Sequence, residues 1–181
     1  VYVLFGDKKY LEGSKAFSEY CLRTQRPDGA FPYFEGKPAV YLPYHALEVW
    51  ELLEANEVLK DKEIESSIER AVAYMSRHYE EFNYSSFDSH KTVSCILLKT
   101  PLWMAKAYLA YGRYEDAFTL FKDADNLFRV PGEPCYFYTL IRLNLKGFRL
   151  HIPVCNSVFM RYNASCFEVG TTFLTKLQEI M

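Results

Sequence analysis

The sequence lacks long apolar runs and blocks of like charge. A membrane-spanning helix needs roughly 18 consecutive apolar residues, and no stretch of the chain approaches that length. Nucleic-acid binding and polybasic membrane anchoring both need clustered lysine and arginine. Because 21 Lys and Arg stand against 23 Asp and Glu, with a net charge of −2, we expect neither nucleic acid nor a membrane among the partners.

Paired cysteines and a targeting signal are also missing. The five cysteines form an odd number and include no Cys-x-x-Cys pair. This pattern favours reduced thiols that serve as small core residues in a cytoplasmic protein. No basic-then-apolar signal peptide stands at Val1, and the chain does not begin with Met, so we expect an upstream piece that was removed or not included.

Common catalytic and cofactor motifs are missing too. The chain has no Gly-rich phosphate loop, no His-Glu-x-x-His and no Gly-x-Ser-x-Gly, and none of its cysteines has a base nearby in sequence. Asp88 and His90 are metal-ligand residue types, but they have no third partner in sequence. We therefore expect neither a cofactor nor a metal.

The chain is rich in aromatic residues and in helical periodicity. It is 50% hydrophobic, with 15 Tyr and 14 Phe, and its 181 residues are enough for one domain with a core. Three segments, 9–23, 63–79 and 114–128, predict helices with one apolar stripe and one polar face. Asp61 stands where the N-cap of the second segment is expected. We call these segments the outer helices.

Three other segments predict helices that are apolar nearly all round. They are Pro43–Ala55, Pro101–Tyr111 and Pro134–Lys146, and each opens with a proline, which suits the first position of a helix. Thr100 precedes the second segment and is its expected N-cap. A helix without a polar face must be enclosed by its neighbours, so we call these segments the inner helices.

Outer and inner helices alternate with a repeat of roughly 50 residues, which is typical of an array of helical hairpins. We therefore predict an all-α fold in one domain over residues 1–181. Residues 1–6 resemble the end of an inner helix before its glycine cap, so the chain is expected to begin within a hairpin, as a fragment of a larger protein. Residues 167–181 are compatible with a fourth outer helix, and residues 151–166 have no clear period.

The stretch Gln25-Arg-Pro-Asp-Gly-Ala-Phe31 is similar to the Q-x-x-D-G-x-W repeat signature of terpenoid cyclases. Together with the helix that begins Pro43-Tyr-His-Ala-Leu, it resembles the α/α-toroid superfamily, which also includes six-hairpin glycosidases, polysaccharide lyases and uronyl epimerases. The resemblance covers residues 10–146 and is closest to the sugar-active members. It implies a partial toroid, completed by a homodimer or by a missing upstream half, with a saccharide cleft where loops lead into the inner helices.

Polar and aromatic residues cluster just before each predicted inner helix. If these helices run parallel about an axis, the side chains meet at one rim, where helix N-termini add partial positive charge. Sugar chemistry uses paired carboxylates and a proton-transfer base, and the catalytic candidates are Glu35, Asp88 and His90. The expected substrate-binding residues are Tyr33, Tyr44, His45, Trp103, Glu133 and Tyr136.

Each candidate also has a purely structural interpretation. Asp28 and Gly29 form a turn signal by themselves, and His45 suits a hydrogen-bonded core histidine. Asp88 suits a helix cap, and a carboxylate at Glu133 is favourable near a helix start without any catalytic role. Tyrosine and tryptophan occur equally in plain helical cores.

Two functions are open from the sequence. The first is a carbohydrate-active or carbohydrate-binding domain, and whether it is an enzyme is undecided. The second is a non-catalytic scaffold of tetratricopeptide type that binds a protein partner. The segment 105–124 matches the tetratricopeptide motif locally, at Tyr108, Gly112, Tyr114, Ala117, Phe121 and Ala124. The scaffold ranks second, because the repeat of this chain is longer than the roughly 34 residues of that motif.

Overall fold

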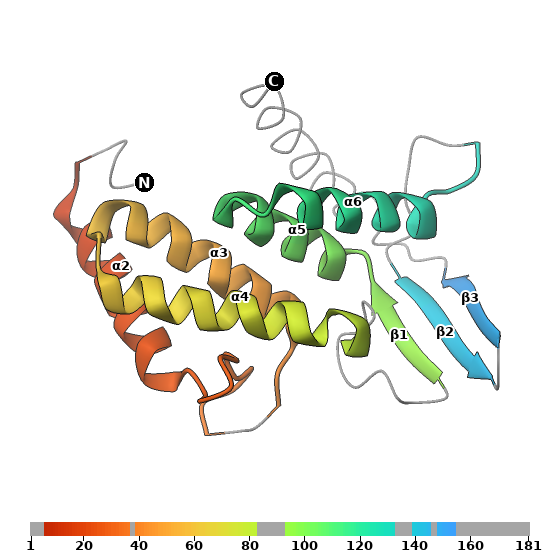
Figure 1. Ribbon diagram of the computed structural model, residues 1–181, viewed down its shortest axis with the longest axis horizontal. Coiled ribbons are helices and arrows are strands. Elements are labelled where there is room, and N and C mark those ends of the chain that lie inside the picture. The colour runs from red at the N-terminus through yellow and green to blue at the C-terminus, as the bar shows by residue number, and fades with distance from the viewer. Residues whose placement is uncertain (1–5, 37–38, 83–92, 133–138, 146–147, 155–181) are drawn as a thin grey trace.

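The computed structural model in Figure 1 describes residues 6–36, 39–82, 93–132, 139–145 and 148–154. Most of this part of the chain is helical, and a small sheet stands at one end of the helices. The elements in chain order are α2 (Lys8–Thr24), α3 (Leu42–Leu59), α4 (Lys62–Phe82), β1 (Val93–Leu97), α5 (Lys99–Tyr111), α6 (Tyr114–Phe128), β2 (Thr139–Leu145) and β3 (Phe148–Val154).

The three outer helices form where their single apolar stripes predict them, as α2, α4 and α6. In α4 the stripe that includes Ile64, Ile68 and Met75 is buried. The Glu63 N–H donates to the Asp61 carboxylate at 2.7 Å, so Asp61 caps the start of the helix as expected. These helices are therefore determined locally, by periodicity and capping.

Two of the three predicted inner helices are present, as α3 and α5, and they pack against each other. Most side chains of α5 are buried between α3, α6 and the sheet. In contrast, α3 is enclosed on only part of its circumference, because Glu51 and Glu54 are exposed. The prediction that α3 lacks a solvent-facing side is therefore wrong.

The prediction of a third inner helix over Pro134–Lys146 is wrong. Residues 139–145 form β2, the central strand of a three-stranded antiparallel sheet in the order β1-β2-β3. The sequence Leu143-Asn-Leu145 alternates with period two, and only two residues separate β2 from β3, which is a hairpin signal. The prediction of a helix followed from the proline start and the apolar residues of the segment and did not use this hairpin signal.

The start of α5 also differs from the prediction. The chain passes from β1 into α5 with only Leu98 between them, so the helix begins at Lys99. Thr100 therefore lies inside the first turn rather than at the N-cap, and its side chain is fully buried. Its hydroxyl has no hydrogen-bond partner within the described part of the chain.

One core joins the helices to the sheet. Its largest fully buried side chains include Leu52 of α3, Met75 of α4, Met104 of α5 and Phe128 of α6, and Leu140 of β2 packs into the same cluster. Cys21 is buried in this core too, as expected of a structural thiol, and burial is the main cause that raises its pKa to about 12.

The predominantly helical fold is confirmed, whereas the partial α/α toroid stays a prediction, because the described helices α2–α6 do not distinguish it from another arrangement of helices. Residues 151–154 belong to β3. The expected helix end at 1–5 and the segments 155–166 and 167–181 lie outside the described residues. No helix in the described ranges is long and apolar enough to cross a membrane.

Candidate functional site

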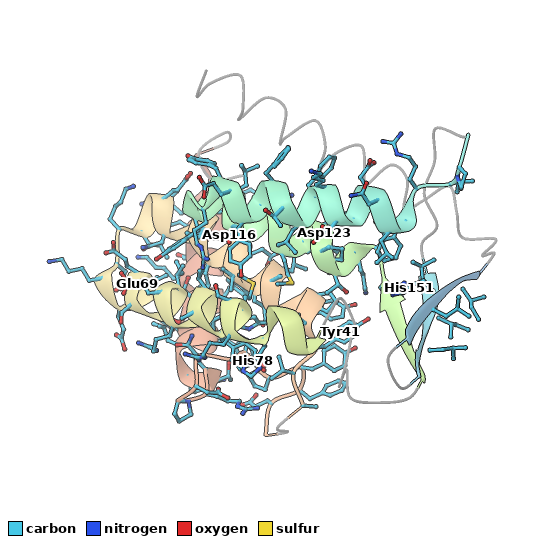
Figure 2. The ribbon with its side chains drawn as sticks, turned by 45° about the vertical axis from the view of Figure 1, so that its right-hand side comes forward. Tyr41, Glu69, His78, Asp116, Asp123 and His151 are labelled. Carbon is cyan, nitrogen blue, oxygen red and sulfur yellow. The ribbon has the colours of Figure 1, made fainter. Side chains whose placement is uncertain are left out.

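The first turns of α3 and α5 come together and bring aromatic side chains into contact. Tyr41 and Tyr44 stand at the start of α3, with ring centroids 5.0 Å apart. The Tyr44 ring lies edge-on to Trp103 of α5 at 5.9 Å. Figure 2 labels Tyr41, and ring side chains gather around it. Two of the helix starts that were predicted to meet at a common rim are thus neighbours.

The loop before α3 adds two more rings. The backbone N–H of Tyr33 donates to the carbonyl of Ala39 at 2.8 Å, which closes the loop and turns Tyr33 toward α3. Its ring stacks on Tyr44 at 5.3 Å and 27°. Phe34 contacts Tyr33 edge-on at 4.2 Å. We call Tyr33, Phe34, Tyr41, Tyr44 and Trp103 together the aromatic platform.

The aromatic platform faces solvent. Tyr33, Phe34 and Tyr44 expose 39%, 59% and 36% of their surface. Apolar rings held together at the surface are unusual unless they meet a ligand or partner, because the hydrophobic effect favours covering them. Exposure of neighbouring rings from two helices and a loop makes this the strongest candidate site in the described part of the molecule.

Lys99, the first residue of α5, lies against the platform. Its Nζ is 4.8 Å from the ring centroid of Tyr44, 5.0 Å from that of Tyr41 and 5.3 Å from that of Trp103. These distances fit cation–π contacts. Burial lowers the pKa of the Lys99 ammonium. Lys99 was absent from the sequence-based candidates, although a lysine between a strand and an aromatic helix start is a signal that could have found it.

The loop from Gln25 to Phe31 holds the platform in place by docking on α4. The Gln25 amide donates to the Ser67 carbonyl at 2.8 Å, and the Arg70 guanidinium donates to the Gln25 side-chain oxygen at 2.6 Å. Gly29 has φ +93°, and a Cβ there would meet the Arg70 carbonyl oxygen at 2.3 Å. Close approach therefore requires glycine here, and this stretch of the loop has a structural role.

Asp28 belongs to the same turn. Its carboxylate accepts the Ala30 N–H at 3.2 Å and pairs with Arg26 at 2.6 Å, and its carbonyl accepts from Arg77 at 2.6 Å. All of these contacts are local or fix the loop to α4. The structural interpretation of Asp28 as a turn residue is therefore confirmed.

His45 is not a substrate-binding residue, which corrects the prediction. It is 1% exposed, its Nδ1 accepts the Phe31 N–H at 3.0 Å, and its Nε2 lies 3.1 Å from the Ala71 carbonyl oxygen. Since Nδ1 accepts, Nε2 carries the proton and donates, so the ring is the neutral Nε2–H tautomer. Burial lowers its pKa to about 4. His45 joins the docked loop to α3 and α4.

The other predicted site residues fall into three groups. Tyr33, Tyr44 and Trp103 are brought together in the platform. Glu35 is an exposed residue of the same loop and lies 3.7 Å from Arg23, with no described contact to the platform rings. Asp88, His90, Glu133 and Tyr136 lie outside the described residues, so their roles stay predictions.

A second surface feature lies at the other end of the helices, where α2 and α3 leave a groove of about 600 Å³. We call it the α2–α3 groove. It is lined by Leu11, Gly13, Ser14, Phe17, Trp50, Glu51, Glu54, Ala55, Glu57 and Val58. Three carboxylates along the solvent side of α3 make one wall acidic, whereas Leu11, Phe17 and Val58 supply apolar surface.

The described residues of the platform supply groups that suit the recognition of a ligand. No group of three His, Cys, Asp or Glu side chains in the described ranges is placed to hold a metal ion. The contacts that join the described platform residues run between rings, and between rings and Lys99. What the described residues do provide is ring faces, tyrosine hydroxyls and one ammonium group.

Comparison of the chain with protein-family models, with curated proteins and with solved structures finds no match in any of the three.

Proposed function

We propose that the protein binds a saccharide at the aromatic platform. The observation that supports this is the exposed set of stacked and edge-on rings at the starts of α3 and α5. Pyranose rings have apolar C–H faces and polar edges, so they suit tyrosine and tryptophan, which combine an apolar face with a hydrogen-bonding end. The toroid resemblance favours the same ligand class, since its sugar-active members are the closest in pattern.

The described residues support binding more strongly than hydrolysis. Glycoside hydrolysis uses two carboxyl groups that flank the scissile bond, roughly 5 to 10 Å apart. Glu35 is the described acid nearest to the platform in sequence, and its carboxylate faces Arg23. The proposed function is therefore a carbohydrate-binding domain, and catalytic roles for Glu35, Asp88 and His90 stay separate predictions.

The test is a binding screen with ring-deletion variants. Isothermal titration and thermal shift against neutral and acidic oligosaccharides should find a ligand, and Tyr44→Ala and Trp103→Ala should each weaken its binding by about tenfold or more through lost stacking. Tyr10→Ala is the matched control, because Tyr10 of α2 is as exposed as Tyr33 and lies outside the platform. Absence of binding across the panel, or equal losses in the control, would contradict the proposal.

A protein partner is the second candidate function, and the α2–α3 groove favours it. An apolar floor beside Glu51, Glu54 and Glu57 complements an amphipathic helix with basic residues along one edge. A fluorescent Lys/Leu helical peptide should bind better than its Glu/Leu counterpart. Charge reversal of Glu51 and Glu57 to Lys should invert that order, whereas Glu65→Lys on α4 should not.

A further inference from the structure

We infer that the saccharide bound at the aromatic platform is acidic, carrying a carboxylate or sulfate group that pairs with the ammonium of Lys99. This inference rests on the proposed saccharide-binding function and adds the chemical class of the ligand. Its basis is the position and the charge environment of Lys99, which is the cation that contacts three of the platform rings.

The rings hold the Lys99 ammonium next to the surface on which a sugar would stack. Tyr41, Tyr44 and Trp103 surround Nζ at 4.8 to 5.3 Å, and Tyr44 is itself 36% exposed. Ring faces attract the charge but offer no oxygen lone pair to its three N–H donors. A ligand stacked on Tyr44 would therefore bring an anionic substituent within reach of an ammonium whose donors the rings leave unsatisfied.

Several other cations of the fold have carboxylate neighbours. Lys9, Arg26 and Arg113 form ion pairs at 2.6 to 3.0 Å with carboxylates two or three residues away. Lys106, on the same helix as Lys99, resembles it most closely, because its Nζ lies 3.4 Å from the ring centroid of Trp50 of α3. Lys106, however, interacts with the Glu51 carboxylate.

Lys99 differs in this respect. None of the ion pairs among the described residues involves it, and burial is the cause that lowers its pKa. A half-buried ammonium that no described carboxylate pairs with costs free energy in the unbound protein, and an anionic ligand removes that cost. Binding of an acidic sugar is favoured over binding of its neutral analogue for this reason.

The experiment compares sugars of equal ring number that differ in charge. The probes are a trimer of α-1,4-linked galacturonic acid, the corresponding neutral galactose trimer, and a sulfated galactose trimer, each titrated calorimetrically into the whole chain. We expect the acidic trimers to bind about tenfold more tightly than the neutral one at low ionic strength. The uronate and sulfate arms show which anion is preferred.

Lys99→Met keeps the apolar stem of the side chain and removes its charge, and Lys106→Met is the matched control on the same helix. We expect Lys99→Met to bind all three trimers within about twofold of one another, with neutral binding retained, and Lys106→Met to keep the wild-type preference. Circular dichroism and the midpoint of thermal unfolding verify that both variants fold.

The outcomes separate the two proposals. Equal binding of neutral and acidic trimers by the wild type would overturn the acidic class and leave saccharide binding in place. Parallel loss of all three sugars in folded Lys99→Met would also overturn it, because the lysine would then act only by ordering the rings. Failure of every trimer to bind the wild type would overturn both proposals.

Discussion

At the scale of single residues, burial decides which polar groups are available to a ligand. His45 and Tyr44 are neighbours in sequence, yet His45 is 1% exposed and fully hydrogen-bonded, whereas Tyr44 is 36% exposed. The side chain of the histidine points between α3 and α4, and that of the tyrosine points to the platform. A one-residue step along a helix rotates the side chain by about 100°, which is enough to separate a core role from a surface role.

The buried neutral His45 predicts acid sensitivity. Its pKa is about 4 in the fold and about 6.5 in the unfolded chain, so between these values the unfolded state binds more protons. Stability should be complete above about pH 6.5 and fall as the pH drops toward 4, by at most about 3 kcal/mol. Urea unfolding at several pH values measures this, and an NMR titration of the His45 ring assigns it. A ring that titrates near 6.5 in the folded protein would contradict the prediction.

Glu48 predicts the opposite pH dependence. Burial, and secondly the charge of Glu51, raise its pKa to about 7, above the value of about 4.5 in the unfolded chain. The protonated form is favoured in the fold, so its stabilisation is present below about pH 4.5 and is lost as the pH rises through 7. Glu48→Gln should therefore raise stability by about 1 kcal/mol at pH 8 and change it little at pH 4.5. Equal effects at both pH values in urea unfolding would contradict this.

At the scale of elements, the docked loop and the helix starts act as one unit. The loop is fixed to α4 by Gln25 and Gly29, and it continues into the segment that carries Tyr33. His45 then connects the same loop to α3 and α4. The position of the exposed rings therefore depends on contacts at the opposite, buried side of the loop.

Gly29→Ala tests this dependence. A Cβ at position 29 meets the Arg70 carbonyl oxygen and has an unfavourable φ of +93°, so we expect a loss of about 3 kcal/mol in the free energy of unfolding. Gly36→Ala is the matched control, because Gly36 also has a positive φ but nothing within 4 Å of the added Cβ. It should cost about 1 kcal/mol. Similar losses in the two variants would show that close docking on α4 is unimportant.

At the scale of the whole molecule, stability is unevenly distributed. Figure 1 places α2 at one end of the helices and the sheet at the other. Of the α2 side chains only Ser18 and Cys21 are buried, whereas α5 buries eight residues, from Thr100 to Leu109. The α2–α3 groove lies at the same end, so α2 and α3 pack less completely against each other there. α2 should therefore open more readily than the centre of the molecule.

Native-state hydrogen exchange measures this difference. The free energy of the opening that exposes the α2 amides should be lower than that for the α5 amides by about 2 kcal/mol or more. The reason is that fewer buried side chains become exposed when α2 detaches. A peptide that fills the α2–α3 groove should slow the exchange of α2 and leave α5 unchanged. Uniform exchange of α2 and α5 would mean that the fold opens only as one unit.

The sequence by itself determined the elements whose signals are local. The apolar stripes of α4 and α6, the cap at Asp61 and the turn at Asp28 and Gly29 each depend on residues within a few positions of one another. These features were predictable for that reason. Three of the platform rings were also named in advance, because aromatic residues stood beside predicted helix starts.

Only the tertiary structure decided which of those residues meet and which are covered. β2 was mistaken for a helix although β3 follows it closely, because its pairing with the distant β1 lies outside any short window of sequence. His45 was assigned to the ligand because nothing local shows that Phe31 and Ala71 occupy both of its nitrogens. Lys99 became part of the site only when α5 packed beside α3. Pairing, burial and ring contacts join residues far apart in the chain, so they are determined when the core forms.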